Sequence, residues 1–142
     1  MKKEIMLKCN KGYEWHRLGG VSVKGYAFDI SDQLLEGREF ARFFEGVDDL
    51  ASFKDKIQQL NGVFSIVLDL SHATYLGVDI NRTFPLFYIK QDEVWFVSDD
   101  ANFLQEKFNL KFNSAAKKEF IHAGYVTGKY TLLENLHQVQ AA

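Results

Sequence analysis

The sequence predicts an α+β fold, because apolar residues alternate with a period of two in some segments and recur at helical spacing in others. The period-two segments come in pairs separated by short turns, as antiparallel hairpins do. The helical segments are segregated from these pairs, which argues against a parallel sheet with crossover helices. The 142 residues contain no repeat and no low-complexity linker, so we expect one domain, residues 1–142.

The N-terminal third is predicted to be mostly strand. Residues 4–9 form a short strand, and residues 15–18 and 21–30 flank Gly19-Gly20, a pair suited to a tight hairpin. Gly25 interrupts the longer strand. A glycine inside a strand usually marks a bulge or the close approach of another backbone segment.

Two helices are predicted next. Residues 34–44 form the first, which Gly46 ends. Residues 49–60 form a clearer one, stopped by Asn61-Gly62, with apolar residues at helical spacing: Leu50, Phe53, Ile57 and Leu60.

Four more strands and two helices complete the prediction. Residues 63–70 and 74–80 pair through a short turn, and residues 86–89 and 94–97 pair around residues 90–93. Ser98 is the expected N-cap of a helix beginning at Asp99-Asp100, with Phe103, Leu104 and Phe108 facing inward. A last helix covers residues 114–122 and ends at Gly124, while residues 130–142 show no pattern. The expected core includes Phe53, Ile57, Phe64, Ile66 and Phe96.

Composition excludes several classes of function. A net charge of −2, with both signs mixed along the chain, offers no basic stripe for nucleic acid. No apolar run approaches the ~20 residues of a membrane span, and no signal peptide is recognisable. Cys9 is the only cysteine and the four histidines lack ligand spacing, so neither a disulfide nor a metal site is expected. A cytoplasmic protein is the simplest interpretation.

Four segments carry a family resemblance. Residues 60–66 read L-N-G-V-F-S-I, residues 78–88 read V-D-I-N-R-T-F-P-L-F-Y, residues 96–99 read F-V-S-D, and residues 124–133 read G-Y-V-T-G-K-Y-T-L-L with Leu136 beyond. In this order they resemble the N-terminal glutaminase domain of asparagine synthetases. That family shows L-N-G-x-F-A-F, then R-D-R-x-G-x-K-P-L-Y-Y, F-A-S-E and G-Y-V-x-G-x-x-T-L-F-x-x-I.

The resemblance implies a class II glutamine amidotransferase fold of the N-terminal-nucleophile hydrolase type. That fold is a four-layer αββα sandwich, with two antiparallel sheets between helical layers. The resemblance also implies that the chain is the N-terminal part of a longer protein, whose synthetase domain would use ATP and magnesium and would be the partner of this domain. A homodimer is a further possible partner arrangement.

This sequence nevertheless lacks some of the catalytic residues of an active family member. Such enzymes use an N-terminal cysteine whose own α-amino group is the base, whereas position 2 is Lys2. Cys9 could become N-terminal only after loss of an eight-residue leader, and its following Asn10-Lys11-Gly12 does not match the family's C-G-I start. Cys9 is better explained as a small apolar residue at a strand end.

The substrate-binding groups also differ. The family's oxyanion-hole segment N-G-E-x-Y-N corresponds best to residues 24–29, in which Gly25 survives and Lys24 replaces the asparagine. Only about twenty residues precede this strand, too few for the family's arginine-bearing segment and its R-G-P-D loop, and Gly37-Arg38-Glu39 lacks the aspartate of the S-D-x-E turn that holds the substrate amine. No catalytic residue is therefore assigned, and Lys24 and Gly25 mark a vestigial glutamine pocket.

The expected function is that of a non-catalytic glutaminase-like domain, as in β-lactam synthetase-like relatives, supporting a downstream synthetase of the asparagine biosynthesis type. Two alternatives remain open. The first is a working amidotransferase that supplies ammonia for asparagine synthesis. The second is a small-molecule sensor that uses the vestigial glutamine pocket, in which Lys24 or Arg38 binds the carboxylate of the ligand.

Overall fold

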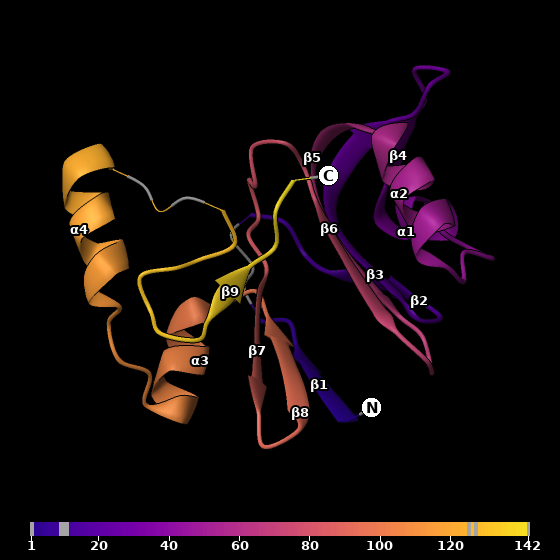
Figure 1. The fold of residues 1–142 in the computed structure, drawn as a ribbon. Coiled ribbons are helices and arrows are strands. Elements are labelled where there is room, and N and C mark those ends of the chain that lie inside the picture. The colour runs from indigo at the N-terminus through magenta and orange to yellow at the C-terminus, as the bar shows by residue number, and fades with distance from the viewer. Residues whose placement is uncertain (1, 9–11, 125, 127, 142) are drawn as a thin grey trace. The chain divides into compact units, whose positions relative to one another are not determined.

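The computed structural model describes residues 2–8, 12–124, 126 and 128–141 (Figure 1). The chain forms two compact units. Unit 1 comprises Met1–Lys8 and Leu86–Gln140, and unit 2 comprises Cys9–Pro85 with Ala141–Ala142. Among the described residues each unit contains one β-sheet, and helices accompany both, so the α+β class is confirmed.

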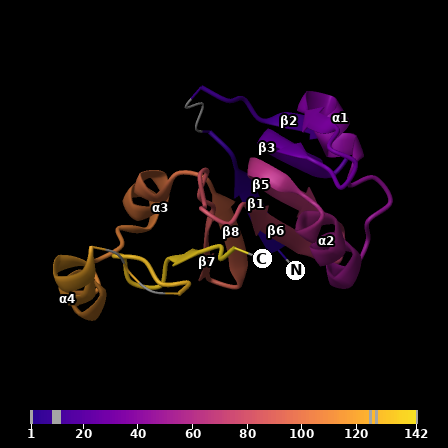
Figure 2. The same ribbon diagram turned by 90° about the horizontal axis from the view of Figure 1, so that it is seen from above.

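The sheet of unit 2 has five strands, all paired antiparallel. Four of them follow the order β2 (His16–Leu18), β3 (Val21–Phe28), β5 (Asn61–Asp69) and β6 (Thr74–Val78), as Figure 2 shows, and β4 (Leu34–Glu36) pairs with one end of β3. The predicted hairpins are confirmed, and the strand expected over residues 63–70 lies between β3 and β6.

The helices of unit 2 agree with the sequence in part. The helix α2 (Leu50–Gln58) lies within the predicted range, and the Asp49 side chain caps it by accepting from Ser52 N at 2.7 Å. The prediction of one helix over residues 34–44 was wrong at its start, because the first three residues form β4. Gly37, with φ +59°, turns the chain from β4 into α1 (Gly37–Arg42).

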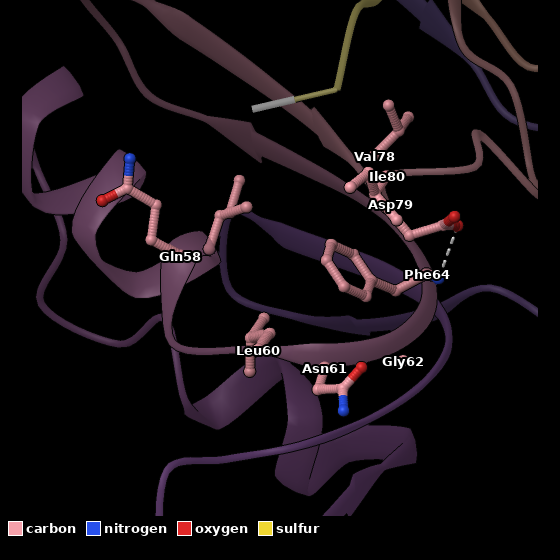
Figure 3. Close-up of a pocket in the computed structure, with 9 residues that line it drawn as sticks. Gln58, Leu60, Asn61, Gly62, Phe64, Val78, Asp79 and Ile80 are labelled. Carbon is pink, nitrogen blue, oxygen red and sulfur yellow. Dashed lines mark hydrogen bonds between the residues drawn. The ribbon is translucent and has the colours of Figure 1, made fainter.

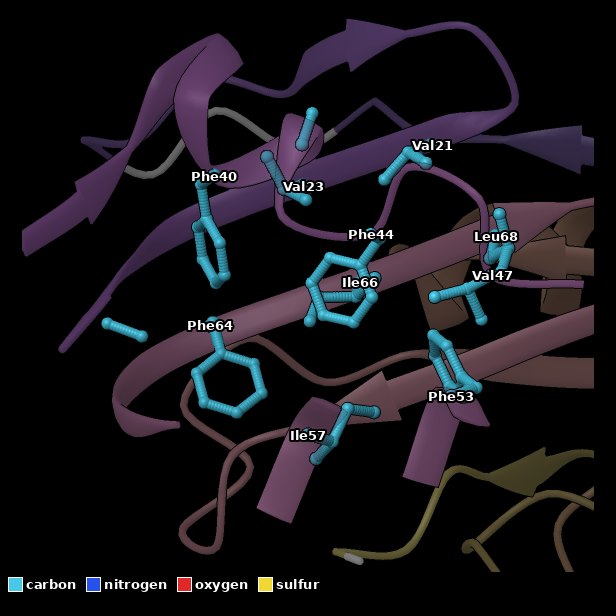
Figure 4. Packing of buried hydrophobic residues seen from close by; sticks show 12 residues of the cluster. Val21, Val23, Phe40, Phe44, Val47, Phe53, Ile57, Phe64, Ile66 and Leu68 are labelled. Atoms are coloured by element: carbon cyan, nitrogen blue, oxygen red, sulfur yellow. The ribbon is translucent and has the colours of Figure 1, made fainter. Parts of the chain in front are cut away.

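Both helices of unit 2 pack on the same face of its sheet (Figure 4). Phe40 lies edge-to-face against Phe64 at 6.0 Å between ring centroids, and Phe44 contacts Phe53 at 5.7 Å. A Cβ on Gly77 would overlap Ile57, so the glycine lets α2 lie close to β6. Burial is confirmed for the four core residues predicted in this unit: Phe53, Ile57, Phe64 and Ile66.

The sheet of unit 1 has the order β1 (Lys2–Met6), β8 (Val94–Ser98), β7 (Phe87–Gln91) and β9 (His137–Gln138). Its β1–β8 pair is parallel, so the prediction of purely antiparallel sheets was wrong for this pair. No short turn joins these two strands, because residues 9–85 of unit 2 and β7 lie between them in the sequence. Strands that are not joined by a hairpin can pair in either direction. β1 begins two residues earlier than predicted, and the predicted end at Cys9 falls outside the described residues.

The helices of unit 1 begin and end with specific caps. Asp100, not Ser98, caps α3 (Ala101–Phe108) by accepting from Phe103 N at 3.2 Å. The predicted cap, Ser98, is the last residue of β8, and its Oγ accepts from Asp100 N at 3.1 Å. The helix α4 (Ser114–Ala123) ends as predicted at Gly124, which has φ +80°.

A second core lies in unit 1 around Ile89, Phe96 and Leu104. Phe96 is buried as predicted; of the three α3 residues expected to face inward, Leu104 is buried and Phe103 and Phe108 are half-buried. The tail for which the sequence showed no pattern completes this core with Leu133 and Leu136 and adds β9 to the sheet. In the part of the chain that is described, no helix is long and apolar enough to cross a membrane.

His137 makes the stability of unit 1 depend on pH. Burial lowers the pKa of His137 from its ordinary value of about 6.5, and the positive charge of Lys129 lowers it further. Between this lowered pKa and the ordinary one, the unfolded chain binds more protons than the folded chain, so stability rises with pH. The melting temperature should fall as the pH drops below about 6.5, and less steeply in His137→Gln than in the exposed control His122→Gln. Identical pH profiles for the two variants would contradict this assignment.

Candidate functional site

Lys24 lies in the middle of β3 and is buried. Strand alternation places Val23 and Ala27 in the core, and Lys24 on the opposite face of the sheet, across from Ser65 of β5. Lys24 is only 3% exposed, and its ammonium lies 5.1 Å from the centre of the Phe84 ring. The Trp15 ring centre is 5.9 Å away. The aromatic faces stabilise the charge while the aliphatic stem packs, so the lysine belongs to the interior of unit 2.

Gly25 has a backbone conformation that requires glycine. Its φ is +91°, and a Cβ at this position would overlap the carbonyl oxygen of Val63 and lie 2.9 Å from Phe84 Cε2. The prediction that this glycine marks a close backbone approach is thereby confirmed. Lys24 and Gly25, expected to mark the vestigial pocket, thus share contacts with Phe84.

Phe84 follows a loop that Asp79 organises. Asp79 is 2% exposed, and its carboxylate accepts from Phe64 N at 3.1 Å, Asn81 N at 2.9 Å and Thr83 N at 3.1 Å. Thr83 Oγ1 also donates to it at 3.0 Å. These bonds fix the chain between β6 and Pro85, which positions Phe84 beside β3.

The segments L-N-G-V-F and V-D-I, which carry half of the family resemblance, meet at one pocket of about 360 Å³ (Figure 3). Its walls are mainly apolar, and Figure 3 shows the Asp79 carboxylate joined to the nitrogen of Phe64. This carboxylate accepts three donors of its own loop and the N–H of Phe64 on β5, so its role here is to hold β5 to the β6 end. The two segments therefore build scaffold.

A second pocket, of about 260 Å³, opens beside Gly25. Its lining comes from the segment before β2, from the first residue of β2, from β3 and from the junction of β4 with α1: Tyr13, Glu14, His16, Gly25, Glu36 and Gly37. Neither Lys24 nor Arg38 lines it. The acidic and aromatic lining residues were missed in the sequence, although the Gly19-Gly20 hairpin register, which pairs His16 with Val23, signals their approach to β3.

The remaining candidate residues do not join this pocket. Lys2 begins β1 of unit 1, and Cys9 falls outside the described residues. Within the described residues no group of three His, Cys, Asp or Glu side chains is arranged to hold a metal ion. Ser65, across from Lys24, is fully buried, and its hydroxyl has no hydrogen-bond partner among the described residues.

Neither a known family model nor a curated protein matches this sequence. The resemblance to glutaminase domains accordingly rests on the four segments quoted above and on the strand that carries Lys24 and Gly25.

Proposed function

We propose that this chain is a non-catalytic glutaminase-like domain of an asparagine synthetase-related protein. In this proposal its two sheets stack between helical layers, as in N-terminal-nucleophile hydrolases, and the domain supports an ATP- and magnesium-dependent synthetase domain. The burial of Lys24 is the observation that carries the proposal. The family resemblance and the scaffold-building role of its shared segments support it.

Lys24 stands where an active relative presents an oxyanion-hole asparagine. An oxyanion hole needs donors aimed at the developing negative charge, and loss of one such donor costs about 10²–10³ in rate. The ammonium of Lys24 instead lies over Phe84 and Trp15, within the interior of unit 2. Gly25 has a backbone conformation that only glycine adopts easily, which supports a site whose scaffold is kept while its chemistry has changed.

The purified chain should release neither glutamate nor ammonia from glutamine above the buffer rate. Without an N-terminal cysteine the covalent route is missing, and the remaining groups have little chemistry to accelerate. Lys2→Cys should not restore turnover, because Lys24 would still replace the oxyanion-hole asparagine and the segments that bind the substrate would still be missing. Turnover that disappears in Cys9→Ala would overturn the proposal and favour the working amidotransferase with a cleaved leader.

The supporting role has its own test. The reading frame that encodes this chain should continue into a synthetase domain with an S-G-G-x-D-S pyrophosphate loop. That domain, produced with and without the present chain attached, should melt at a lower temperature when it stands alone, because binding to the folded state stabilises it. Equal melting temperatures would contradict a supporting role.

A further inference from the structure

The pocket beside Gly25 has a floor without side chains. Gly25 and Gly37 both have positive φ, at +91° and +59°, and both line the pocket. His16 Nδ1 lies 4.0 Å from the point where a Cβ would stand on Gly37, so the imidazole borders this floor. The volume of about 260 Å³ lies below the range of about 300–1,000 Å³ for drug-sized ligands, which limits any occupant to a small molecule.

The charged groups of the lining are carboxylates. Glu14 and Glu36 line the pocket from the segment before β2 and from the end of β4, and no lysine or arginine lines it. Neither glutamate forms a salt bridge within the described part of the chain. Lys24 does not line the pocket, and its ammonium lies against the Phe84 and Trp15 rings, so the two negative groups of the lining favour a positively charged occupant.

An aromatic ring supplies an independent preference for a cation. Tyr13 lines the pocket, and its ring packs 5.2 Å from Phe84 and 6.4 Å from Tyr26, measured between centroids. The Tyr26 ring in turn lies 6.3 Å from that of Phe28, so Tyr13 belongs to a row of neighbouring rings. Tyr13 remains 40% exposed, which leaves ring surface available to a ligand. Aromatic faces carry negative potential and attract ammonium groups.

We propose that this pocket binds a small organic ammonium ion. The carboxylates supply the long-range attraction, the Tyr13 ring contacts the alkyl groups on nitrogen, and the glycine floor admits the ligand close to the backbone. This is the reverse of the carboxylate recognition expected of a glutamine pocket. The inference goes beyond the proposed function, because it concerns a ligand site and rests on the structure of unit 2 alone, without the family resemblance.

Choline and its uncharged carbon isostere 3,3-dimethylbutan-1-ol separate charge from shape. Titrated into the full chain and followed by NMR, choline should bind with millimolar affinity, and the isostere at least about tenfold more weakly. Glu36→Gln and Tyr13→Leu should each weaken choline binding by about 3–5-fold. The matched controls, Glu106→Gln on α3 and Tyr130→Leu in unit 1, should leave it unchanged.

Equal affinity for choline and the isostere would overturn the proposal, as would binding that is indifferent to both pocket variants. No saturable binding up to about 100 mM choline would also overturn it. Both pocket positions are at least partly exposed, so folded variants are expected, and unchanged melting temperatures check this. Glutamine turnover is a separate readout, so failure here leaves the proposed non-catalytic role untouched.

Discussion

Asp79→Ala should lower the free energy of unfolding by about 3–5 kcal/mol, because it breaks a network of four hydrogen bonds to a buried carboxylate and leaves the buried Phe64 N–H without an acceptor, which alone costs about 1–3 kcal/mol. The substitution deprives the backbone N–H groups of Phe64, Asn81 and Thr83 of their shared acceptor. The Phe64 bond ties β5 to the loop after β6, so the loss also loosens the placement of Phe84. Urea denaturation followed by circular dichroism measures the change.

Asp29 provides a matched control within the same unit. Its carboxylate also accepts from the N–H groups two and four residues later, Ser31 at 2.8 Å and Gln33 at 3.0 Å, in an exposed loop. The third residue after each aspartate, Asp32 or Arg82, has positive φ in both loops. Because water can replace the carboxylate at Asp29, Asp29→Ala should cost about 1 kcal/mol or less. Similar losses for Asp29→Ala and Asp79→Ala would show that burial does not set the cost.

The parts of the fold that were predicted correctly rest on local signals. The spacing of Phe53 and Ile57 defines the buried side of α2, and Asn61-Gly62 marks the change to β5. Gly124 ends α4 by adopting a left-handed conformation, which sequence reasoning expects of a glycine there. These signals span a few residues, so they survive without knowledge of the tertiary structure.

The predictions were wrong where contacts with residues far away in the sequence determine the local structure. Leu34–Glu36 has residues suited to a helix but pairs with β3, and the hydrogen bonds of that sheet override local propensity. The direction of β1 depends on β8, which lies beyond unit 2 in the sequence. Ser98 and Asp100 are both good capping residues, and the length of β8 selects the second.

The candidate site could be predicted only in outline. Motif comparison identified Lys24 and Gly25. Strand alternation places Lys24 on the face opposite Val23, and the close approach of the Val63 carbonyl explains why Gly25 has no side chain. Phe84 lies sixty positions further along, so its contact with both residues depends on the Asp79 loop. The carboxylates beside Gly25 come from separate segments that only the paired strands bring together.

Gly25→Ala should destabilise the chain by at least about 4 kcal/mol, because the added Cβ combines steric overlap in the interior with backbone strain. Positive φ alone costs a non-glycine residue about 1–2 kcal/mol. At +91° the added Cβ would in addition overlap the Val63 carbonyl oxygen, which is fixed in the β3–β5 ladder. Relief of this overlap requires β3 and β5 to separate. The unfolding midpoint in urea is the measurement.

Gly46→Ala separates backbone strain from this overlap. Gly46 has φ +81°, close to that of Gly25, but nothing lies within 4 Å of the position of its Cβ. Its substitution should therefore cost only the strain of positive φ, about 1–2 kcal/mol. The difference between the two variants measures how tightly β5 lies against β3 at the residue that follows Lys24. If both alanine variants lost the same stability, the close approach of Val63 to Gly25 would be wrong, and β3 would have room for a side chain at this position.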